Sequence, residues 1–437
     1  MTKFVDPLTW LFGLEQFGIK FGLDNIAGIV AALGHPERSF ASVHVAGTNG
    51  KGSVTAMVDT ALRAAGHRSA RYTSPHLIDV TERFVIGGRP IQREALSAVV
   101  ADVRTVIDRL REGGRLDLHP TFFEVTTAVA FELFRRAEVE IAVCEVGLGG
   151  RLDATNVVQP LATAITSIGL DHQQYLGQTL QEIAVEKAGI LKPGVPVIVG
   201  KMPAEAFTAI AEIARDRGCT VVRAWDGVSV DDLRPAPGTK RRMRLRTPAH
   251  DYGELEFGLR GSHQVDNAVV AVRLLDALDA RGIPVPPAAV AEGLSHVQWP
   301  GRLDLVRLPD GREALLDAAH NADGAAALAA FLRTMSSEKP PLVFAAMRDK
   351  AIDRMLSELA TTVSAFVFTC ASNPRSADPS DLAARARAIA PGLRVEVEPS
   401  PARALMAAWR IAPRIVVAGS IFLIGDVLKE IGGVVIR

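Results

Sequence analysis

Along most of the chain, apolar runs that end in small or polar residues alternate with amphipathic stretches of helical spacing. This alternation is typical of parallel sheets covered by helices. Residues 42–47, SVHVAG, predict a buried strand, and apolar residues then recur at helical spacing from Val54 to Ala65. Gly66 follows at the place where a helix commonly ends. The pattern predicts a strand, a glycine turn and a helix in succession.

Further elements follow the same rhythm. We expect strands at 139–146 and 161–168, and a helix that begins at the capping box TLQE, residues 179–182. From about 220 to 260 the pattern changes to short alternating strands separated by turns, which predicts a small antiparallel subregion. A helix is then expected near DNAVVAVRLLDAL, residues 266–278.

The succession of strands and helices starts afresh near VQWPGR, residues 297–302, and continues in strict alternation to the end of the chain. We therefore predict an α/β protein of two domains. Residues 1–297 should form a mainly parallel sheet with the small antiparallel subregion, and residues 298–437 a doubly wound, Rossmann-like domain.

Composition narrows the class of protein. A chain of 437 residues favours two domains, with three as the alternative. Its 49 basic and 49 acidic residues cancel, which argues against nucleic acid or an anionic membrane as a partner. In the basic run KRRMRLR, residues 240–246, charges alternate with Met243 and Leu245, so a solvated strand face is favoured over a binding patch.

The cysteines and the apolar segments indicate the compartment. Cys144, Cys219 and Cys370 are odd in number and widely spaced, which argues against a disulfide framework and a structural zinc site. The N-terminus has no apolar signal core, and no apolar run reaches the roughly 18 residues of a membrane span. We expect a soluble protein of the reducing cytoplasm.

The strongest chemical signal is GTNGKGS, residues 47–53, between the predicted strand and helix. Backbone amides of a glycine-rich turn at a helix N-terminus bind phosphate oxygens, and Lys51 would add a positive charge. The common phosphate loop has Ser or Thr directly after the lysine, whereas here Gly52 intervenes before Ser53. The alternative is a tight turn with an exposed lysine.

Two neighbouring strands are predicted to end in polar groups at the edge where α/β proteins bind ligands. Glu145 ends the strand of residues 139–146 and would suit Mg²⁺ as a hard oxygen ligand, or it could cap the next helix. Asp171 and His172 follow the strand of residues 161–168. A lone histidine in this position is more often a satisfied hydrogen-bonding residue than a ligand.

Four further residues are candidates on weaker grounds. Lys187 lies on the helix that TLQE opens, where a solvated lysine is the simplest interpretation. Asp317 and His320 lie in a strand-to-helix turn of the second domain. Arg302 follows the domain boundary, and its guanidinium could reach phosphates.

Together these motifs resemble the folylpolyglutamate synthase and dihydrofolate synthase family of the Mur ligase superfamily. The resemblance rests on motifs that extend over nearly the whole chain, in this order: GTNGKGS, TSPHL, TFFE, EVGLGGRLDATN, GLDH, EKAGI, GSHQVDNA, PGR, LDAAHN and GSIFLIGDV. Cell-wall Mur ligases have Ser or Thr directly after the loop lysine, whereas the folate branch inserts the glycine seen here as Gly52. The resemblance thus points to folate rather than peptidoglycan.

The resemblance implies an ATP-dependent ligase in which the γ-phosphoryl group activates a carboxylate as an acyl phosphate that L-glutamate then attacks. It assigns residues 1–297 to an ATP-binding domain and 298–437 to a glutamate ligase domain. ATP would be held by Thr48, Asn49, Gly50, Lys51, Gly52, Ser53, Asn267, Arg302 and Asp317. Mg²⁺, two ions in this family, would be held by Ser74, Glu145, His172 and a carbamylated Lys187. Lys51, His172, Lys187 and His320 would act in catalysis, His320 on the glutamate and acyl-phosphate side.

The same resemblance implies a pterin pocket formed by Thr121, Phe122, Phe123, Glu124 and Asp153, which IKFG, residues 19–22, could cover. Phe122 and Phe123 could instead be core aromatics. We expect a monomer that uses both 7,8-dihydropteroate and tetrahydrofolate; whether it needs a monovalent cation stays open.

The alternatives are an enzyme with only one of these reactions, a Mur-type ligase of UDP-linked muramyl substrates, and a nucleotide-dependent switch. The Mur-type ligase is disfavoured by Gly52 and by the lack of a UDP-binding domain ahead of the loop. The switch is disfavoured because it would have little use for Glu145, His172, Asp317 and His320 together.

Overall fold

The computed structural model describes residues 6–18, 20–116, 119–233, 241–335 and 338–432. The chain divides into two compact units. The N-terminal unit comprises Met1–Gly258 and Asp266–Val297, and the C-terminal unit comprises Leu259–Val265 and Gln298–Arg437.

The N-terminal unit is built on an eight-stranded sheet of order β4-β3-β2-β5-β1-β6-β7-β8. Its strands are β1 Ala41–Ala46, β2 Ser69–Tyr72, β3 Phe84–Ile86, β4 Arg89–Pro90, β5 Ile141–Glu145, β6 Ala162–Ile165, β7 Val197–Val199 and β8 Val221–Arg223. From β2 to β8 the strands are parallel, and β3 and β4 add an antiparallel edge. The strands β1, β5 and β6 are almost wholly buried, as expected for a parallel sheet covered on both faces.

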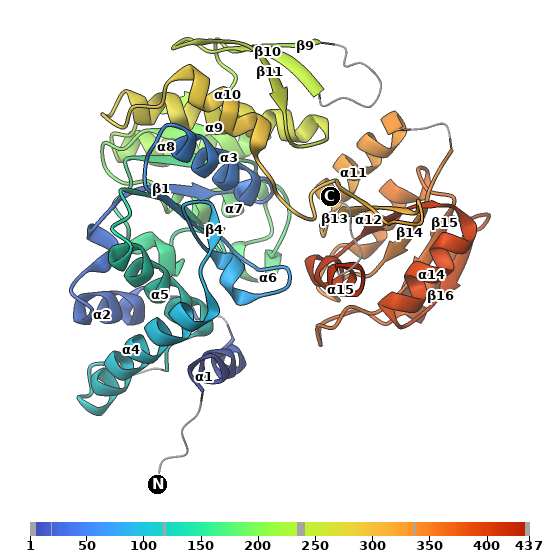
Figure 1. The fold of residues 1–437 in the computed structure, drawn as a ribbon, viewed down its shortest axis with the longest axis horizontal. Coiled ribbons are helices and arrows are strands. Elements are labelled where there is room, and N and C mark those ends of the chain that lie inside the picture. Colours follow the sequence, from blue (N-terminus) through green and yellow to red (C-terminus); the bar gives the residue numbers. More distant parts are fainter. Residues whose placement is uncertain (1–5, 19, 117–118, 234–240, 336–337, 433–437) are drawn as a thin grey trace. The chain divides into compact units, whose positions relative to one another are not determined.

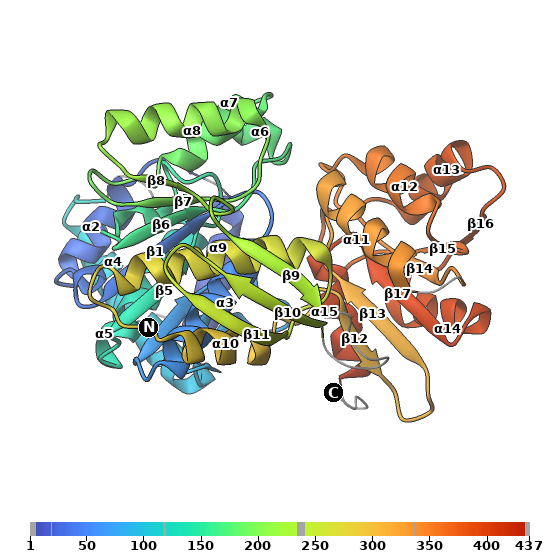
Figure 2. The ribbon, with the colours of Figure 1, turned by 90° about the horizontal axis from the view of Figure 1, so that it is seen from above.

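Helices cover this sheet: α1 Pro7–Gly13, α2 Asp24–Ala32, α3 Lys51–Ala64, α4 Arg93–Glu112, α5 Phe122–Arg136, α6 Gln173–Leu176, α7 Leu180–Ala188, α8 Ala204–Asp216, α9 Ser262–Asp279 and α10 Pro287–His296. In the described part of the chain, short 3-10 helices accompany them: η1 Leu14–Phe17, η2 Pro36–Arg38, η3 Val80–Arg83 and η4 Ala154–Val157. Helix α3 packs against α10, and α7 against α8 (Figure 2). No helix among the described residues is long and apolar enough to cross a membrane.

A separate three-stranded antiparallel sheet contains β9 Ser229–Leu233, β10 Arg241–Arg246 and β11 Asp251–Phe257. On β10 the apolar Met243 and Leu245 are buried, while Arg242 and Arg244 are exposed. The solvated strand face is therefore confirmed for the described part of KRRMRLR; Lys240 lies outside the described residues. The antiparallel subregion is confirmed from β9 on, but β8, within the same predicted range, instead pairs in parallel with β7 in the large sheet.

The C-terminal unit has a six-stranded sheet of order β12-β13-β17-β14-β15-β16, parallel except for β12. Its strands are β12 Asp304–Arg307, β13 Glu313–Asp317, β14 Pro341–Phe344, β15 Ala365–Phe368, β16 Arg394–Val397 and β17 Arg414–Ala418, and its helices are α11 Ala322–Met335, α12 Ile352–Ala360, α13 Pro379–Ile389, α14 Pro401–Ile411 and α15 Ile421–Ile431. From β13 on, strands and helices alternate as predicted (orange to red in Figure 1), whereas β12 is followed directly by β13 and departs from the strict alternation. The α/β fold with mainly parallel sheets is confirmed.

Candidate functional site

In the N-terminal unit, the predicted site residues gather at the carboxyl edge of the large sheet. The connection after β1 leads to β2 on one side of the sheet, whereas the connection after the neighbouring β6 leads to β7 on the other side. In open α/β sheets, ligands bind outside the carboxyl ends of strands at such a switch point. The loops that follow β1, β2, β5 and β6 therefore meet where a ligand is expected.

The glycine turn after β1 is closely packed. Gly47 has a φ of +149° and Gly50 a φ of +87°. A Cβ atom on Gly47 would overlap the hydroxyl of Thr166, and one on Gly50 would overlap the side-chain amide of Asn267. The structure thus brings Asn267, from α9, against the turn. Only glycine fits these two positions without strain.

Hydrogen bonds tie this turn to the loop after β6. The amide of Thr48 donates to the Ser167 carbonyl at 2.8 Å, and the Thr48 hydroxyl donates to the Gly169 carbonyl at 3.2 Å. The Thr166 hydroxyl donates to the Asn49 carbonyl at 2.6 Å. The Thr48 side chain is therefore used to hold the turn in shape, a role that the sequence did not predict. Lys51, Gly52 and Ser53 form the first turn of α3.

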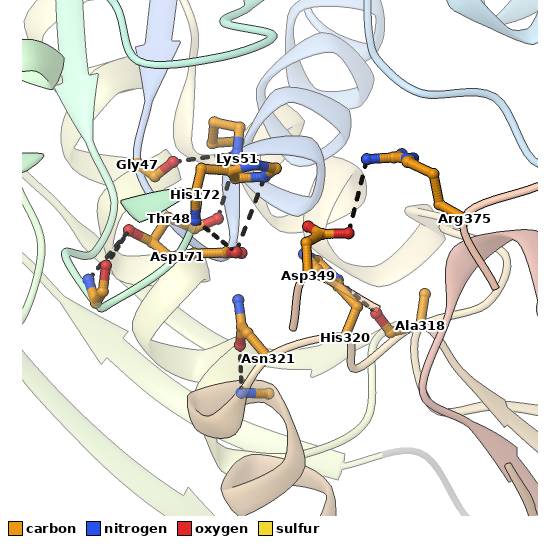
Figure 3. Close-up of polar contacts among 12 residues, drawn as sticks. Gly47, Thr48, Lys51, Asp171, His172, Ala318, His320, Asn321, Asp349 and Arg375 are labelled. Atoms are coloured by element: carbon orange, nitrogen blue, oxygen red, sulfur yellow. Dashed lines mark hydrogen bonds and ion pairs between the residues drawn. The ribbon is translucent and has the colours of Figure 1, made fainter. Parts of the chain in front are cut away.

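Two lysine side chains converge on one carbonyl of the turn. Lys51 Nζ lies 3.1 Å from the Gly47 carbonyl oxygen and 3.3 Å from that of Thr48 (Figure 3). Lys187 Nζ donates to the same Gly47 oxygen at 2.9 Å. A solvated Lys187 is therefore wrong: the residue is only 5% exposed, because α7 packs this side chain under the turn.

The environment of Lys187 shifts its protonation. Burial and, to a smaller extent, the positive charge of Lys51 lower the pKa of Lys187 from 10.5 to about 7, against the opposing effect of Asp171 and Asp153. A substantial share of Lys187 amines is therefore neutral near pH 7. A neutral amine is a nucleophile, whereas an ammonium is not.

Only some of the residues predicted to bind Mg²⁺ contact one another. Glu145, buried at the end of β5, accepts a hydrogen bond from the Ser74 amide at 3.1 Å. It does not cap the next helix, because Asp153 caps η4. His172 has a left-handed backbone, φ +52°, and its amide donates to Asp171 (Figure 3). Among the described residues, no group of three or more His, Cys, Asp or Glu side chains is placed to hold a metal ion.

The chemistry of this donor set fits Mg²⁺ in part. The Glu145 carboxylate and the Ser74 hydroxyl are hard oxygen donors of the kind that Mg²⁺ prefers. An unmodified Lys187 amine is not such a donor, whereas its carbamate would be.

The segment TFFE begins α5. Thr121 and Glu124 form a capping box in which the Thr121 amide and hydroxyl donate to the Glu124 carboxylate at 2.7 and 2.9 Å. Phe122 is buried and stacks on Phe12, with ring centroids 5.9 Å apart. Phe122 is therefore a core aromatic. The side chains of Thr121, Phe122 and Glu124 all make contacts within the protein.

Phe123 differs from its neighbours because it is only partly buried. Its ring lies against Gly147, where a Cβ atom would overlap it, and its centroid is 6.0 Å from that of Tyr72. In IKFG, Ile19 lies outside the described residues. Phe21 is 54% exposed, and its ring centroid is 6.0 Å from that of Tyr175 in α6.

Asp153 is buried and closes the loop that follows β5. Its carboxylate accepts hydrogen bonds from the amides of Leu148 and Thr155 at 2.9 and 3.0 Å, and from the Thr155 hydroxyl. Burial raises the pKa of Asp153, and these hydrogen bonds oppose the rise.

In the C-terminal unit, Asp317 ends β13 and is buried. It accepts hydrogen bonds from the amides of Leu303 and Ala319 at 2.9 and 3.0 Å. Burial raises the pKa of Asp317, and Arg302 is the strongest group that opposes this rise. The structure therefore brings Asp317 and the arginine of PGR into electrostatic contact.

His320 lies in the turn that leads into α11. Its Nδ1 lies 2.9 Å from the Ala318 carbonyl oxygen (Figure 3), a contact that requires the proton to be on Nδ1. Asn321 accepts a hydrogen bond from the Gly324 amide at 2.9 Å and so caps this helix.

Comparison with known proteins identifies the family to which this chain belongs. Residues 45–275 match the Mur ligase middle domain, and residues 301–421 match the Mur ligase, glutamate ligase domain. A dihydrofolate synthase/folylpolyglutamate synthase of Bacillus subtilis is 36% identical over 386 residues, 87% of this chain and 88% of that protein. The chain belongs to the folylpolyglutamate synthase and dihydrofolate synthase family of Mur ligases. As a member of this family it is an ATP-dependent ligase of an acid and an amino acid.

Solved structures of the family agree with this fold. A Mycobacterium tuberculosis folylpolyglutamate synthase complexed with ADP and AMPPCP has a TM-score of 0.89 and 31% identity, over 98% of this chain and 99% of that chain. Escherichia coli FolC in complex with DHPP and ADP has a TM-score of 0.83 and 29% identity, over 98% of each chain.

One buried residue of this family member was missed in the sequence. His44, at the middle of β1, contacts Thr155 and is fully buried. The available signal was a histidine that interrupts the apolar run of a strand directly ahead of the phosphate loop.

Proposed function

We propose that the protein joins L-glutamate to the carboxylate of pterin and folate substrates through an acyl phosphate, and that one site serves both 7,8-dihydropteroate and tetrahydrofolate. The observation that carries the proposal is the convergence of Lys51 and Lys187 on Gly47 beside the glycine turn. The Lys51 cation suits a phosphoryl group, and a carbamylated Lys187 beside it would supply an anionic oxygen donor. The Bacillus subtilis relative carries both synthase names, and the Escherichia coli structure contains DHPP and ADP.

A carboxylate resists condensation with an amine because its charge is delocalised and oxide is a poor leaving group. Transfer of the γ-phosphoryl group from ATP to a carboxylate oxygen forms an acyl phosphate, a mixed anhydride, and releases ADP. The amine of L-glutamate then attacks the carbonyl carbon, the bond from this carbon to the phosphate oxygen breaks, phosphate leaves, and the nitrogen loses a proton to give the amide. The backbone amides of the turn and Lys51 would hold the phosphates and neutralise charge.

Glu145 and Ser74 would hold Mg²⁺, together with His172 and a carbamylated Lys187. When bound, this ion neutralises the charge of the phosphate oxygens. Asn267, Arg302 and Asp317 would contact the nucleotide, and His320 the glutamate side. Thr121, Phe122, Phe123, Glu124 and Asp153 would line the pterin pocket. We propose residues 1–297 as the ATP-binding domain and 298–437 as the glutamate ligase domain of a cytoplasmic monomer.

The carbamate follows from the state of Lys187. Its neutral amine attacks carbon dioxide, a nitrogen–carbon bond forms, and one proton is released to water. The product carries a negative charge in place of a positive one and therefore relieves the repulsion between Lys187 and Lys51, whose amines contact the same oxygen.

The test is release of ADP in the presence of ATP, Mg²⁺ and L-glutamate, measured in parallel with 7,8-dihydropteroate and with tetrahydrofolate. Turnover with both substrates is expected. Turnover with one alone would assign the protein to that step, and turnover with only a UDP-linked muramyl acceptor would make it a Mur-type ligase. Nucleotide binding without turnover of any acceptor would favour the switch.

Glu145→Gln tests the proposed metal site with little change in shape. The amide oxygen can still accept the hydrogen bond of the Ser74 amide, so the fold should persist. The charge that we assign to Mg²⁺ is removed, so turnover should fall by at least about a hundredfold. Unchanged turnover would exclude Glu145 from the metal site.

A further inference from the structure

A continuous chain of buried polar groups connects β1 to the loop after β5. His44 Nε2 lies 2.8 Å from the Thr155 hydroxyl oxygen, and that hydroxyl contacts Asp153 Oδ1. His44 and Thr155 are both 0% exposed, and Asp153 is buried as well. Buried polar groups of this kind are costly unless they are hydrogen-bonded, so the chain must be satisfied in one definite arrangement.

The direction of the hydrogen bonds follows from the acceptors. Both oxygens of Asp153 accept backbone amides, from Thr155 and Leu148, which is the pattern of an ionised carboxylate. The single proton of the Thr155 hydroxyl therefore goes to Asp153. Its oxygen must then accept the remaining hydrogen bond, which makes His44 Nε2 a donor.

A neutral imidazole carries one N–H, so His44 Nδ1 is left without a proton. This atom is buried and has no hydrogen-bond partner among the described residues. In the opposite tautomer the same position would hold an unpaired N–H, and orphaned N–H groups are the rarer kind in proteins. Burial, with a smaller effect of Lys192, lowers the pKa of His44 to about 3, which agrees with a neutral ring at any working pH.

The far end of this chain holds backbone next to Phe123, a residue of the proposed pterin pocket. Asp153 accepts a hydrogen bond from the Leu148 amide and so fixes the backbone at the start of the loop that follows β5. The preceding residue, Gly147, is the surface on which the Phe123 ring rests. Any rotation of Asp153 would release the Leu148 amide and loosen the backbone beneath that ring.

We propose that His44 is a positioning residue for the pterin site: it donates from Nε2 to Thr155, which holds Asp153, and through Asp153 the Gly147–Leu148 backbone beneath Phe123. This assignment rests on the proposed function, because it takes Phe123 and Asp153 as parts of the pterin pocket. His44 itself does not touch the substrate.

Nitrogen NMR of histidine-labelled enzyme tests the proton arrangement without any substrate. The His44 signals, assigned by their loss in His44→Gln, should show a protonated Nε2 and a bare Nδ1 between pH 5 and 9. A protonated Nδ1, or titration within this range, would overturn the proposal.

Kinetics test the positioning role. His44→Gln keeps an N–H donor at similar reach, whereas His44→Leu removes the donor at similar volume. We expect His44→Leu to raise KM for 7,8-dihydropteroate about tenfold, the effect of one lost buried hydrogen bond, with KM for ATP within about twofold. His44→Gln should recover most of this loss. Equal defects in the two variants, or a parallel rise in KM for ATP, would refute the role.

A second pair of variants tests the same role in case His44→Leu does not fold. Thr155→Val removes the hydroxyl at nearly constant shape, and Thr155→Ser retains it. The valine variant should show the dihydropteroate defect and the serine variant should not; two equal variants would again refute the role. If the wild type turned over no pterin substrate, the proposed function would fail and the pterin role of His44 with it, while NMR would still decide the proton arrangement.

Discussion

Replacing Lys187 with methionine should make the protein more stable at neutral and acidic pH. In the wild type a buried amine with a pKa of about 7 must be either charged in a poorly solvating site or deprotonated. In the unfolded chain the same amine has its ordinary pKa of 10.5. Methionine has similar length, carries no charge, and suits a buried position.

The magnitude follows from the two pKa values. At pH 6 the amine is charged in both states, and burial costs about 4–5 kcal/mol relative to a neutral side chain. At pH 9 the folded amine is neutral while the unfolded one is still charged, and about 2 kcal/mol remains. Between about pH 7 and 10.5 the unfolded state binds more protons, so the wild type gains stability as pH rises.

The advantage of Lys187→Met should therefore shrink by about 2–3 kcal/mol from pH 6 to pH 9. Loss of the hydrogen bond to Gly47 shifts both ends equally and leaves this change intact. The assay is urea unfolding in buffer free of carbon dioxide, followed by tryptophan fluorescence. Trp299 and Trp409 are replaced by Phe, so the signal comes from the N-terminal unit.

If the free energies of unfolding of the wild type and of Lys187→Met changed in parallel from pH 6 to pH 9, the lowered pKa of Lys187 would be refuted. Bicarbonate provides a second arm. It should raise the urea midpoint of the wild type at pH 8, since a carbamate can form only in the folded site, and leave Lys187→Met unchanged. A bicarbonate effect of equal size in both proteins would refute the carbamate.

Three further predictions follow from packing. Gly50→Ala should weaken ATP binding in calorimetry at least about tenfold, because the φ is +87° and the new Cβ atom would overlap Asn267; ATP binding within about twofold of the wild type would disprove the requirement for glycine. Asp59→Ala should lower the free energy of unfolding by about 3–5 kcal/mol in urea, since Asp59 is buried and the partly buried Arg71, 2.9 Å away, loses its carboxylate; a change below about 1 kcal/mol would contradict this. Thr121→Ala should cost about 1 kcal/mol in thermal unfolding through loss of the α5 cap; an unchanged Tm with a raised KM for dihydropteroate would assign Thr121 to substrate alone.

The glycine turn was predictable from sequence because its requirements are local. Positive φ at Gly50 and the close approach at Gly47 demand glycine, and the strand and helix on either side have clear periodicities. The same holds for the capping box of α7, which begins at Leu180 after Thr179. Such features are decided within a few residues.

The burial of Lys187 was not predictable in this way. A lysine near the end of a short helix is usually solvated, and its burial depends on where α7 packs against a turn 140 positions away. Likewise, β8 reads like the short strands after it, but its pairing with β7 depends on the position of the whole sheet edge. Properties that depend on packing between distant segments need the three-dimensional structure.

The glycine turn after β1 is held in place by groups that lie far from it in the sequence. Thr166 and Ser167 hold Asn49 across 117 and 118 positions, and Gly169 holds Thr48 across 121. These contacts can form only after β6 has docked beside β1, because each of them crosses that strand pair. A peptide of residues 41–66 would therefore carry the whole motif and yet lack the nucleotide site. During refolding, nucleotide binding would appear late. It would begin when β6 docks beside β1 and not when the glycine turn forms.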